Sequence, residues 1–242
     1  MRNIWTIAKR EYQHFFISPI AYAIAFIILL ILGIIFYLNV VAAVAQQYAP
    51  DISIVTGPMV TLLLFTTPAV TMRALAEEQR MGTLELLLTA PVKDWELIVG
   101  KWLGAFLFYL TLILVTWIFP LILNRLISPG IDQGLMLASY LGLILMVAAL
   151  LAVGIAVSSL FSNQIAAFFA CIGVILVLWM LGSAVQQATG TWANIISYLS
   201  LSGHYDTFST GVIELKDTIY FLSMTALGLF LGTMALEVRR WR

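Results

Sequence analysis

The sequence predicts an all-α membrane protein with six transmembrane helices, and two observations lead to that prediction. Of its 242 residues, 62% are hydrophobic and only 10% are charged, and the mean hydropathy is +1.02. A soluble domain of this size needs far more charge on its surface, so lipid must be the solvent for much of the chain. In addition, six stretches contain no Lys, Arg, Asp or Glu, and each approaches or exceeds the roughly 20 residues that cross a bilayer as a helix.

The six predicted spans are Ile20–Ala45, Ile54–Met72, Trp102–Leu123, Leu135–Phe161, Ile165–Val185 and Ile219–Leu236. The first follows a basic start, as a signal peptide would, but its apolar run is much longer than the roughly 7–15 residues of a signal peptide's apolar core. Small residues crowd positions 142–159, which predicts close packing of the fourth span against other helices. The tight turn at 162–164 predicts that the fourth and fifth spans form an antiparallel hairpin.

Basic residues in the loops predict the orientation of the spans. With both termini on one side, that side holds ten Lys and Arg residues, and the opposite side holds only Arg125 and Lys216. We therefore expect a multi-pass protein of the bacterial cytoplasmic (inner) membrane with both termini in the cytoplasm. The outer loops then cover 46–53, 124–134 and 186–218. The last of these is rich in aromatic residues, and it is predicted to form either short interfacial or re-entrant helices or an ordered surface loop.

Residues 1–18 are predicted to form an amphipathic helix in the cytoplasmic interface. At about 100° per residue, one face of this helix is apolar and the other is polar. The apolar face holds Ile4, Trp5, Ala8, Tyr12, Phe15 and Phe16, and the polar face holds Arg2, Thr6, Lys9, Arg10, Gln13 and His14. Ser18 and Pro19 then break the helix and turn the chain into the membrane. Residues 19–242 form the six-span domain.

Residues that could do chemistry are sparse. Spans without charge disfavour a carrier driven by a proton or sodium gradient. The pair Gly100-Lys101 lacks the rest of a P-loop, so we do not expect this chain to bind ATP. One cysteine and two histidines, with neither histidine inside a span, disfavour a metal cluster and an intramembrane protease. Zero net charge and the lack of a basic tract disfavour nucleic acid as a partner. We expect no catalytic, cofactor-binding or metal-binding residue.

The most informative segment is the cytoplasmic loop 73–101, RALAEEQRMGTLELLLTAPVKDWELIVGK. The second span is predicted to continue into this loop as a helix until Gly82 breaks it. Thr83 can cap a short amphipathic helix, Leu84–Thr89, whose leucines share one face and which Pro91 ends. Composition alone leaves open whether this helix docks into another protein or lies on the membrane.

This loop resembles the signature of type-2 ABC transporter permeases, in which an acidic-basic cluster precedes GTLELLLTAP and a helix ending in GKWLGAF. The gliding-motility-associated subgroup of that family is the closer resemblance. It rests on SPIAYAIAF after the N-terminal helix, on PAVTMRALAEEQRMGTLELLLTAP, and on YLGLILMVAALLAVGIAVSSLFSNQIAAF. One departure is Lys93, where such permeases often have a Ser or Thr that can cap the next helix.

The resemblance implies a non-catalytic permease subunit of an ABC exporter. Two permease subunits, the same or different, would form the pathway, and the second can carry a large extracytoplasmic domain. Two separate ATPase subunits would bind ATP and Mg. The residues that would form or flank the coupling helix in an ATPase groove are Glu77, Glu78, Arg80, Gly82, Thr83 and Glu85. The alternative is a membrane anchor that transmits ATP turnover mechanically to a surface or motility complex without classical transport.

Overall fold

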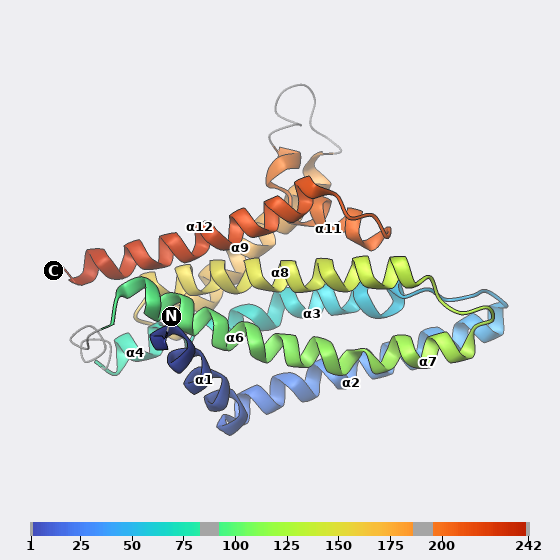
Figure 1. Ribbon diagram of the computed structural model, residues 1–242, viewed down its shortest axis with the longest axis horizontal. Coiled ribbons are helices and arrows are strands. Elements are labelled where there is room, and N and C mark those ends of the chain that lie inside the picture. The colour runs from blue at the N-terminus through green and yellow to red at the C-terminus, as the bar shows by residue number, and fades with distance from the viewer. Residues whose placement is uncertain (1, 83–91, 186–195, 241–242) are drawn as a thin grey trace.

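The computed structural model describes residues 2–82, 92–185 and 196–240, and every regular element in these ranges is helical. Figure 1 shows the longest helices running along the long axis of the molecule. The helices are α1 (Arg2–Ile17), α2 (Pro19–Gln46), α3 (Ser53–Thr71), α4 (Ala76–Arg80), α6 (Asp94–Thr116), α7 (Ile118–Leu126), α8 (Gln133–Leu160), α9 (Gln164–Val185), α11 (Leu201–Ser209) and α12 (Leu215–Arg240).

Six helical stretches of the described residues are long and apolar enough to cross a membrane, which confirms the predicted number of spans. They are Pro19–Gln46, Ser53–Arg80, Asp94–Leu126, Gln133–Leu160, Gln164–Ser183 and Leu215–Arg239. The third begins at Asp94 rather than at Trp102, and the sixth begins at Leu215 rather than at Ile219. An apolar run marks only the part of a helix that needs lipid. These two helices extend beyond their apolar runs through charged residues that form ion pairs within the protein, such as Lys101.

Helix α8 is the centre of the molecule, and it contacts α3, α6, α9, α11 and α12. Its small residues let the neighbouring helices approach closely, as the sequence predicted. A Cβ added to Gly228 of α12 would lie 2.7 Å from the backbone carbon of Ala152, and a Cβ on Gly154 would overlap the side chain of Thr71. After a short turn, α9 contacts α8, and it also contacts α3 and α11, so the fourth and fifth spans pack together as predicted. The Asn163 side chain starts α9 by accepting a hydrogen bond from the Ile165 N–H at 2.9 Å.

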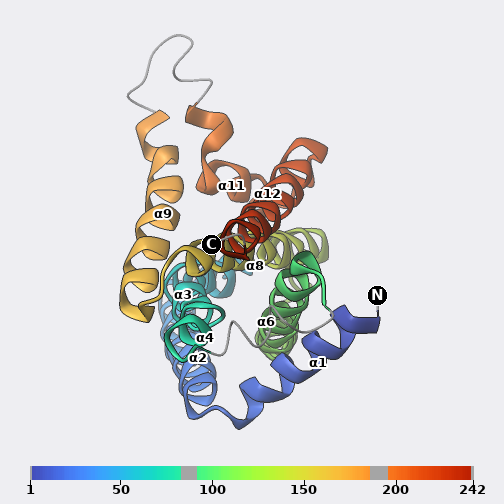
Figure 2. The same ribbon diagram turned by 90° about the vertical axis from the view of Figure 1, so that its left-hand side faces the viewer.

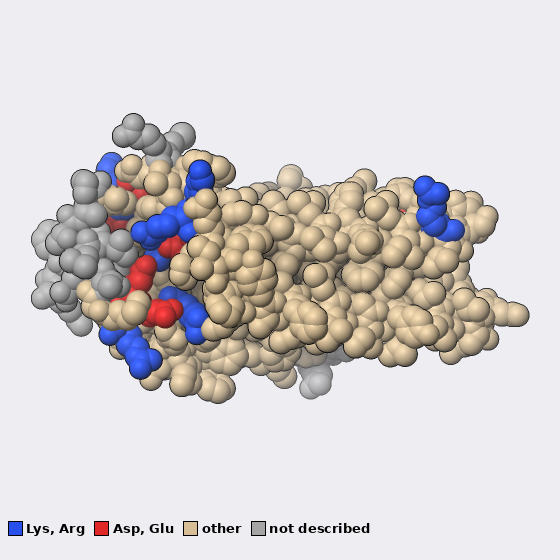
Figure 3. Space-filling model, turned by 90° about the horizontal axis from the view of Figure 1, so that it is seen from below, with Lys and Arg blue, Asp and Glu red and all other residues tan. Residues whose placement is uncertain are grey.

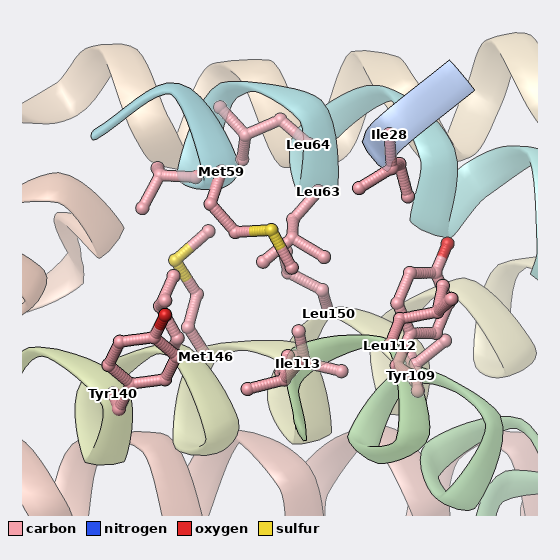
Figure 4. Packing of buried hydrophobic residues seen from close by; sticks show 14 of the residues in the cluster. Ile28, Met59, Leu63, Leu64, Tyr109, Leu112, Ile113, Tyr140, Met146 and Leu150 are labelled. Atoms are coloured by element: carbon pink, nitrogen blue, oxygen red, sulfur yellow. The ribbon is translucent and has the colours of Figure 1, made fainter. Parts of the chain in front are cut away.

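The main core lies between α3, α6 and α8. Figure 4 shows side chains from these three helices meeting there, among them Met59, Leu63, Ile113, Met146 and Leu150. The outer helices are much less covered, since α2 and α9 expose many large apolar side chains such as Phe26 and Phe169. Exposed apolar faces of this extent suit lipid or a partner subunit.

The charged side chains gather at one end of the molecule. Figure 3 shows Lys, Arg, Asp and Glu clustered at the end that holds α1, α4 and the start of α6, which we call the charged end. The surface between the two ends in this view carries almost no charge. A charge-free belt of this kind is what a membrane-spanning protein needs around its middle.

At the opposite end, the described part of the 186–218 loop forms a packed short helix. Helix α11 lies against α8 and α9, with Leu201 and Phe208 fully buried. Phe208 covers Gly142, where an added Cβ would lie 2.6 Å from the Phe208 Cβ. Of the two predicted forms of this loop, its described part therefore adopts the short helix, at Leu201–Ser209, and residues 215–218 already belong to α12.

Candidate functional site

The segment that follows α3 is held against α8 by one serine. The N–H groups of Leu75 and Ala76 both donate to Ser158 Oγ at 3.2 Å, and the Ser158 hydroxyl donates to the Met72 carbonyl at 3.3 Å. Leu75 and Ala76 are also fully buried. The sequence predicted one helix running on from α3, but a turn at 72–75 interrupts it because Ser158 takes up the backbone groups there. The start of α4 is therefore anchored to α8 by these hydrogen bonds.

The centre of the charged end is a buried ion network around Lys101. Its Nζ lies 2.6 Å from Glu78 Oε1 of α4 and 3.2 Å from Glu11 Oε1 of α1, and Arg10 contacts Glu11 at 3.1 Å. The Lys101 side chain is only 3% exposed, so its charge is sustained by these two carboxylates rather than by water. Three elements far apart in the sequence are thus joined at one nitrogen.

Glu11 is a stable member of this network in its ionised form. Burial acts to raise its pKa, but the charges and hydrogen bonds of Lys101 and Arg10 together outweigh burial and hold the pKa below its usual value. Its ionised form is therefore stabilised in the folded protein.

Helix α1 is bound along α6 rather than resting only in the membrane interface. An added Cβ would lie 2.7 Å from the Ile7 side chain at Gly100 and 2.6 Å from the Glu11 Cβ at Gly104, so only glycine permits this approach. Further along, the Tyr12 hydroxyl lies 3.0 Å from the Thr111 hydroxyl. Figure 2, which faces the charged end, shows α1 against α6.

The start of α6 is secured without the serine or threonine cap that Lys93 replaces. Glu96 Oε2 accepts the Lys93 N–H at 3.2 Å, which is the reciprocal half of a capping box. The same oxygen accepts a hydrogen bond from the Asn3 side chain of α1 at 3.1 Å. The cap thus adds another link between α1 and α6.

The residues predicted for coupling fall into three groups. Glu78 points inward to Lys101, and Glu77 is half-buried beside it. Arg80 is exposed, and Gly82 ends the segment with a φ of +69°, a conformation that glycine adopts without strain. Thr83 and Glu85, with the predicted helix Leu84–Thr89, lie outside the described residues. Contact of the whole set with an ATPase stays a prediction.

Sequence reasoning missed the residues that join this set to the bundle. The sequence offers Lys101 as a cytoplasmic basic residue, as part of the GKWLGAF block and as part of a failed P-loop, but not as the centre of a buried network, and it predicts no role for Glu11. The spacing of Gly100 and Gly104, four residues apart on one helix face, was a signal for a closely packed partner helix. Nothing in the sequence alone identified α1 as that partner.

A second polar cluster lies at the opposite end, around a histidine. His204 Nδ1 lies 2.6 Å from Asp217 Oδ1, its Nε2 lies 3.2 Å from the Tyr198 carbonyl, and its ring stacks on Tyr220 at 3.9 Å. Both ring nitrogens are occupied by acceptors, so His204 is not placed to serve as a general base. This pair fixes α11 to α12. The described residues hold no group of three or more His, Cys, Asp and Glu side chains that could bind a metal ion.

Residues 43–236, most of the chain, match the model of the ABC-2 family transporter protein. The chain belongs to the ABC-2 transporter family. No curated protein matches it.

Family membership sets the role of the ABC-2 chain in outline. It is a multi-pass permease subunit of an ABC transporter, and the membrane components of this family generally carry no catalytic activity. Such a permease works with an ABC ATPase and with the membrane around it. The match does not include α1, so the contacts of α1 with α6 come from the structure alone.

Proposed function

We propose that this permease is the pathway-forming subunit of an ABC exporter, and that it receives movement from its ATPase through the charged end. The observation that carries the proposal is the Lys101 network. Glu78 and Lys101 form the base of the segment between α4 and α6, so a partner that displaces this segment pulls on α6 and, through Glu11, on α1. Two permease subunits and two ATPase subunits complete the transporter, with ATP and Mg bound by the ATPases.

The network suits this role because it resists being pulled apart. Separating Lys101 from its two partly exposed carboxylates costs about 2–3 kcal/mol, so α4 and α6 move together more readily than they separate. Helix α6 is in turn tied to α8 by the hydrogen bond from Trp102 Nε1 to the Ala148 carbonyl at 2.9 Å. Movement of α4 is thereby passed to the central helix as a rigid-body displacement.

The proposed orientation places the charged end in the cytoplasm of the inner membrane, with both termini there. The excess of Lys and Arg on that side supports it. Within the segment, Arg80 is exposed where an ATPase would approach. We assign the contact to Arg80, Gly82, Thr83 and Glu85, with Glu77 and Glu78 flanking it. The gliding-type sequence blocks are the basis on which we propose that the transporter belongs to that subgroup.

Purified chain and ATPase test this proposal. The chain alone should hydrolyse no ATP above a buffer control, because its sequence carries no P-loop. With its ATPase in proteoliposomes, Glu85→Ala should reduce assembly or uncouple ATP turnover, whereas Glu214→Ala at the opposite end should not. ATP hydrolysis by the isolated chain, or equal behaviour of the two variants, would count against the proposal. ATP turnover without movement of any cargo would favour the mechanical anchor instead.

A further inference from the structure

A cavity of about 480 Å³ lies at the charged end, between α1, α2, α3 and α6. Its size is within the range of about 300–1,000 Å³ that is usual for small-molecule sites. Alanines face it from three helices, namely Ala21, Ala69 and Ala105, so the space stays open where larger apolar side chains would fill it. Neither the Lys101 network nor the family match accounts for this cavity.

The cavity is amphipathic. One side is apolar, with Ile20 and Ile24 of α2 and Val70 of α3, and the other side is charged. Three cationic and three acidic side chains line the charged side, so its formal charge balances. Since the apolar side belongs to spanning helices and the charged side to the end of the bundle, the cavity follows the polarity of one membrane leaflet.

Two of the lining charges are left over when the ion pairs are assigned. The ion network described above pairs the charges of four lining residues with one another, namely Arg10, Glu11, Glu78 and Lys101. Arg73 Nε is buried and has no hydrogen-bond partner among the described residues. Neither Arg73 nor Glu77 forms an ion pair within the described part of the chain, although both line the cavity. A buried polar group without a partner is costly, so a ligand that supplies one is favoured.

We infer that this cavity binds a zwitterionic phospholipid with a primary amine, phosphatidylethanolamine, from the surrounding leaflet. Its phosphate meets the Arg73 guanidinium, its ammonium meets the Glu77 carboxylate, and its acyl chains lie along the apolar side. An anionic lipid such as phosphatidylglycerol would satisfy Arg73 but leave Glu77 facing a negative charge. Phosphatidylcholine carries an ammonium with no N–H to donate. The inference does not depend on the proposed coupling to an ATPase.

The test is native mass spectrometry of the full-length chain, stripped of lipid in detergent and supplied with the three lipids with identical acyl chains. Phosphatidylethanolamine should bind about ten-fold more tightly than the other two, the effect of one charge-assisted hydrogen bond. Arg73→Gln should lose about ten-fold in affinity for all three lipids, because each of them carries the phosphate that Arg73 meets. Glu77→Gln should remove the preference for phosphatidylethanolamine over phosphatidylglycerol. Arg80→Gln, an exposed cation outside the cavity, is the matched control and should bind as the unmodified chain does.

A variant that leaves the charges in place guards against misfolding as an explanation. Ala69→Phe should fill the cavity and abolish the headgroup preference while the melting temperature stays near that of the unmodified chain. Binding without headgroup preference in the unmodified chain, or Arg73→Gln binding as tightly as Arg80→Gln, would overturn the site. A preference for phosphatidylglycerol would overturn the role of Glu77.

Discussion

Replacing Lys101 with methionine removes the centre of the ion network while keeping the length of the side chain. Two carboxylates that shared one ammonium then face each other with no cation between them. Breaking a buried ion pair from one side costs about 3–5 kcal/mol. The Glu11 and Glu78 side chains are 20% and 17% exposed, so water solvates them in part and lowers this cost. We therefore expect a loss of about 2–3 kcal/mol.

The assay is thermal unfolding of the purified chain, followed by ATP turnover of the assembled complex. For a chain of this size the melting temperature should fall by roughly 5–10 °C. ATP turnover should lose its response to the permease, because α4 is no longer tied to α6. Lys101→Met combined with Glu78→Gln should recover part of the stability, since it removes the Glu78 charge that has lost its ammonium, whereas Glu11 keeps its contact with Arg10.

The matched control is the exposed ion pair Lys216–Glu214 at the opposite end, whose side chains are 61% and 42% exposed. Lys216→Met should leave the melting temperature unchanged, because water solvates the remaining carboxylate. If Lys101→Met had the melting temperature of the unmodified chain, or if the double variant were no more stable than the single one, the network would not hold these helices together.

Three further predictions concern α1, its carboxylate and the orientation. Gly104→Ala should destabilise the chain by about 1–3 kcal/mol, because the new Cβ meets Glu11 and the Ala8 backbone; Gly173→Ala, which meets nothing within 4 Å, is the control in the same thermal assay. The stability that Glu11 contributes over Glu11→Gln should be complete above pH 4.5 and disappear as the pH falls through its lowered pKa, as unfolding against pH would show; a constant difference at every pH would contradict this. A cysteine placed at Gln47 should react with an impermeant reagent in sealed cells, and one at Lys93 should not; native Cys171 is buried and should stay silent.

The spans were predictable because lipid imposes one requirement on every residue that faces it. An apolar run long enough to cross the bilayer is visible in sequence without knowledge of its neighbours. The small residues of α8 were predictable for a related reason, since they signal close approach whichever helix approaches. What could not be predicted was the partner: that Gly228 meets Ala152, or that Gly104 meets α1, depends on how the helices assemble.

The contacts at the charged end were harder still to predict, because a charged residue looks the same in the sequence whether water or another side chain stabilises its charge. Glu78 and Arg80 belong to one acidic-basic cluster, yet one is held inside on Lys101 and the other is exposed. Asp217 was read as part of a loop, but it lies on α12, buried against His204. Long-range contacts decide these outcomes, over separations of 23 residues for Glu78 and 13 for Asp217.

On the proposed coupling, the position of the ion network predicts which helices would carry movement from the charged end. The Glu78–Lys101 contact joins α4 to α6, so a partner that displaces one of these helices should displace the other. These helices are tied to α8 through Ser158 and to α1 through Glu11. By contrast, α2 and α9 keep large exposed apolar faces and no ion pair with the network among the described residues. We therefore expect α1, α6 and α8 to move as one body, and α2 and α9 to be the helices past which that body slides.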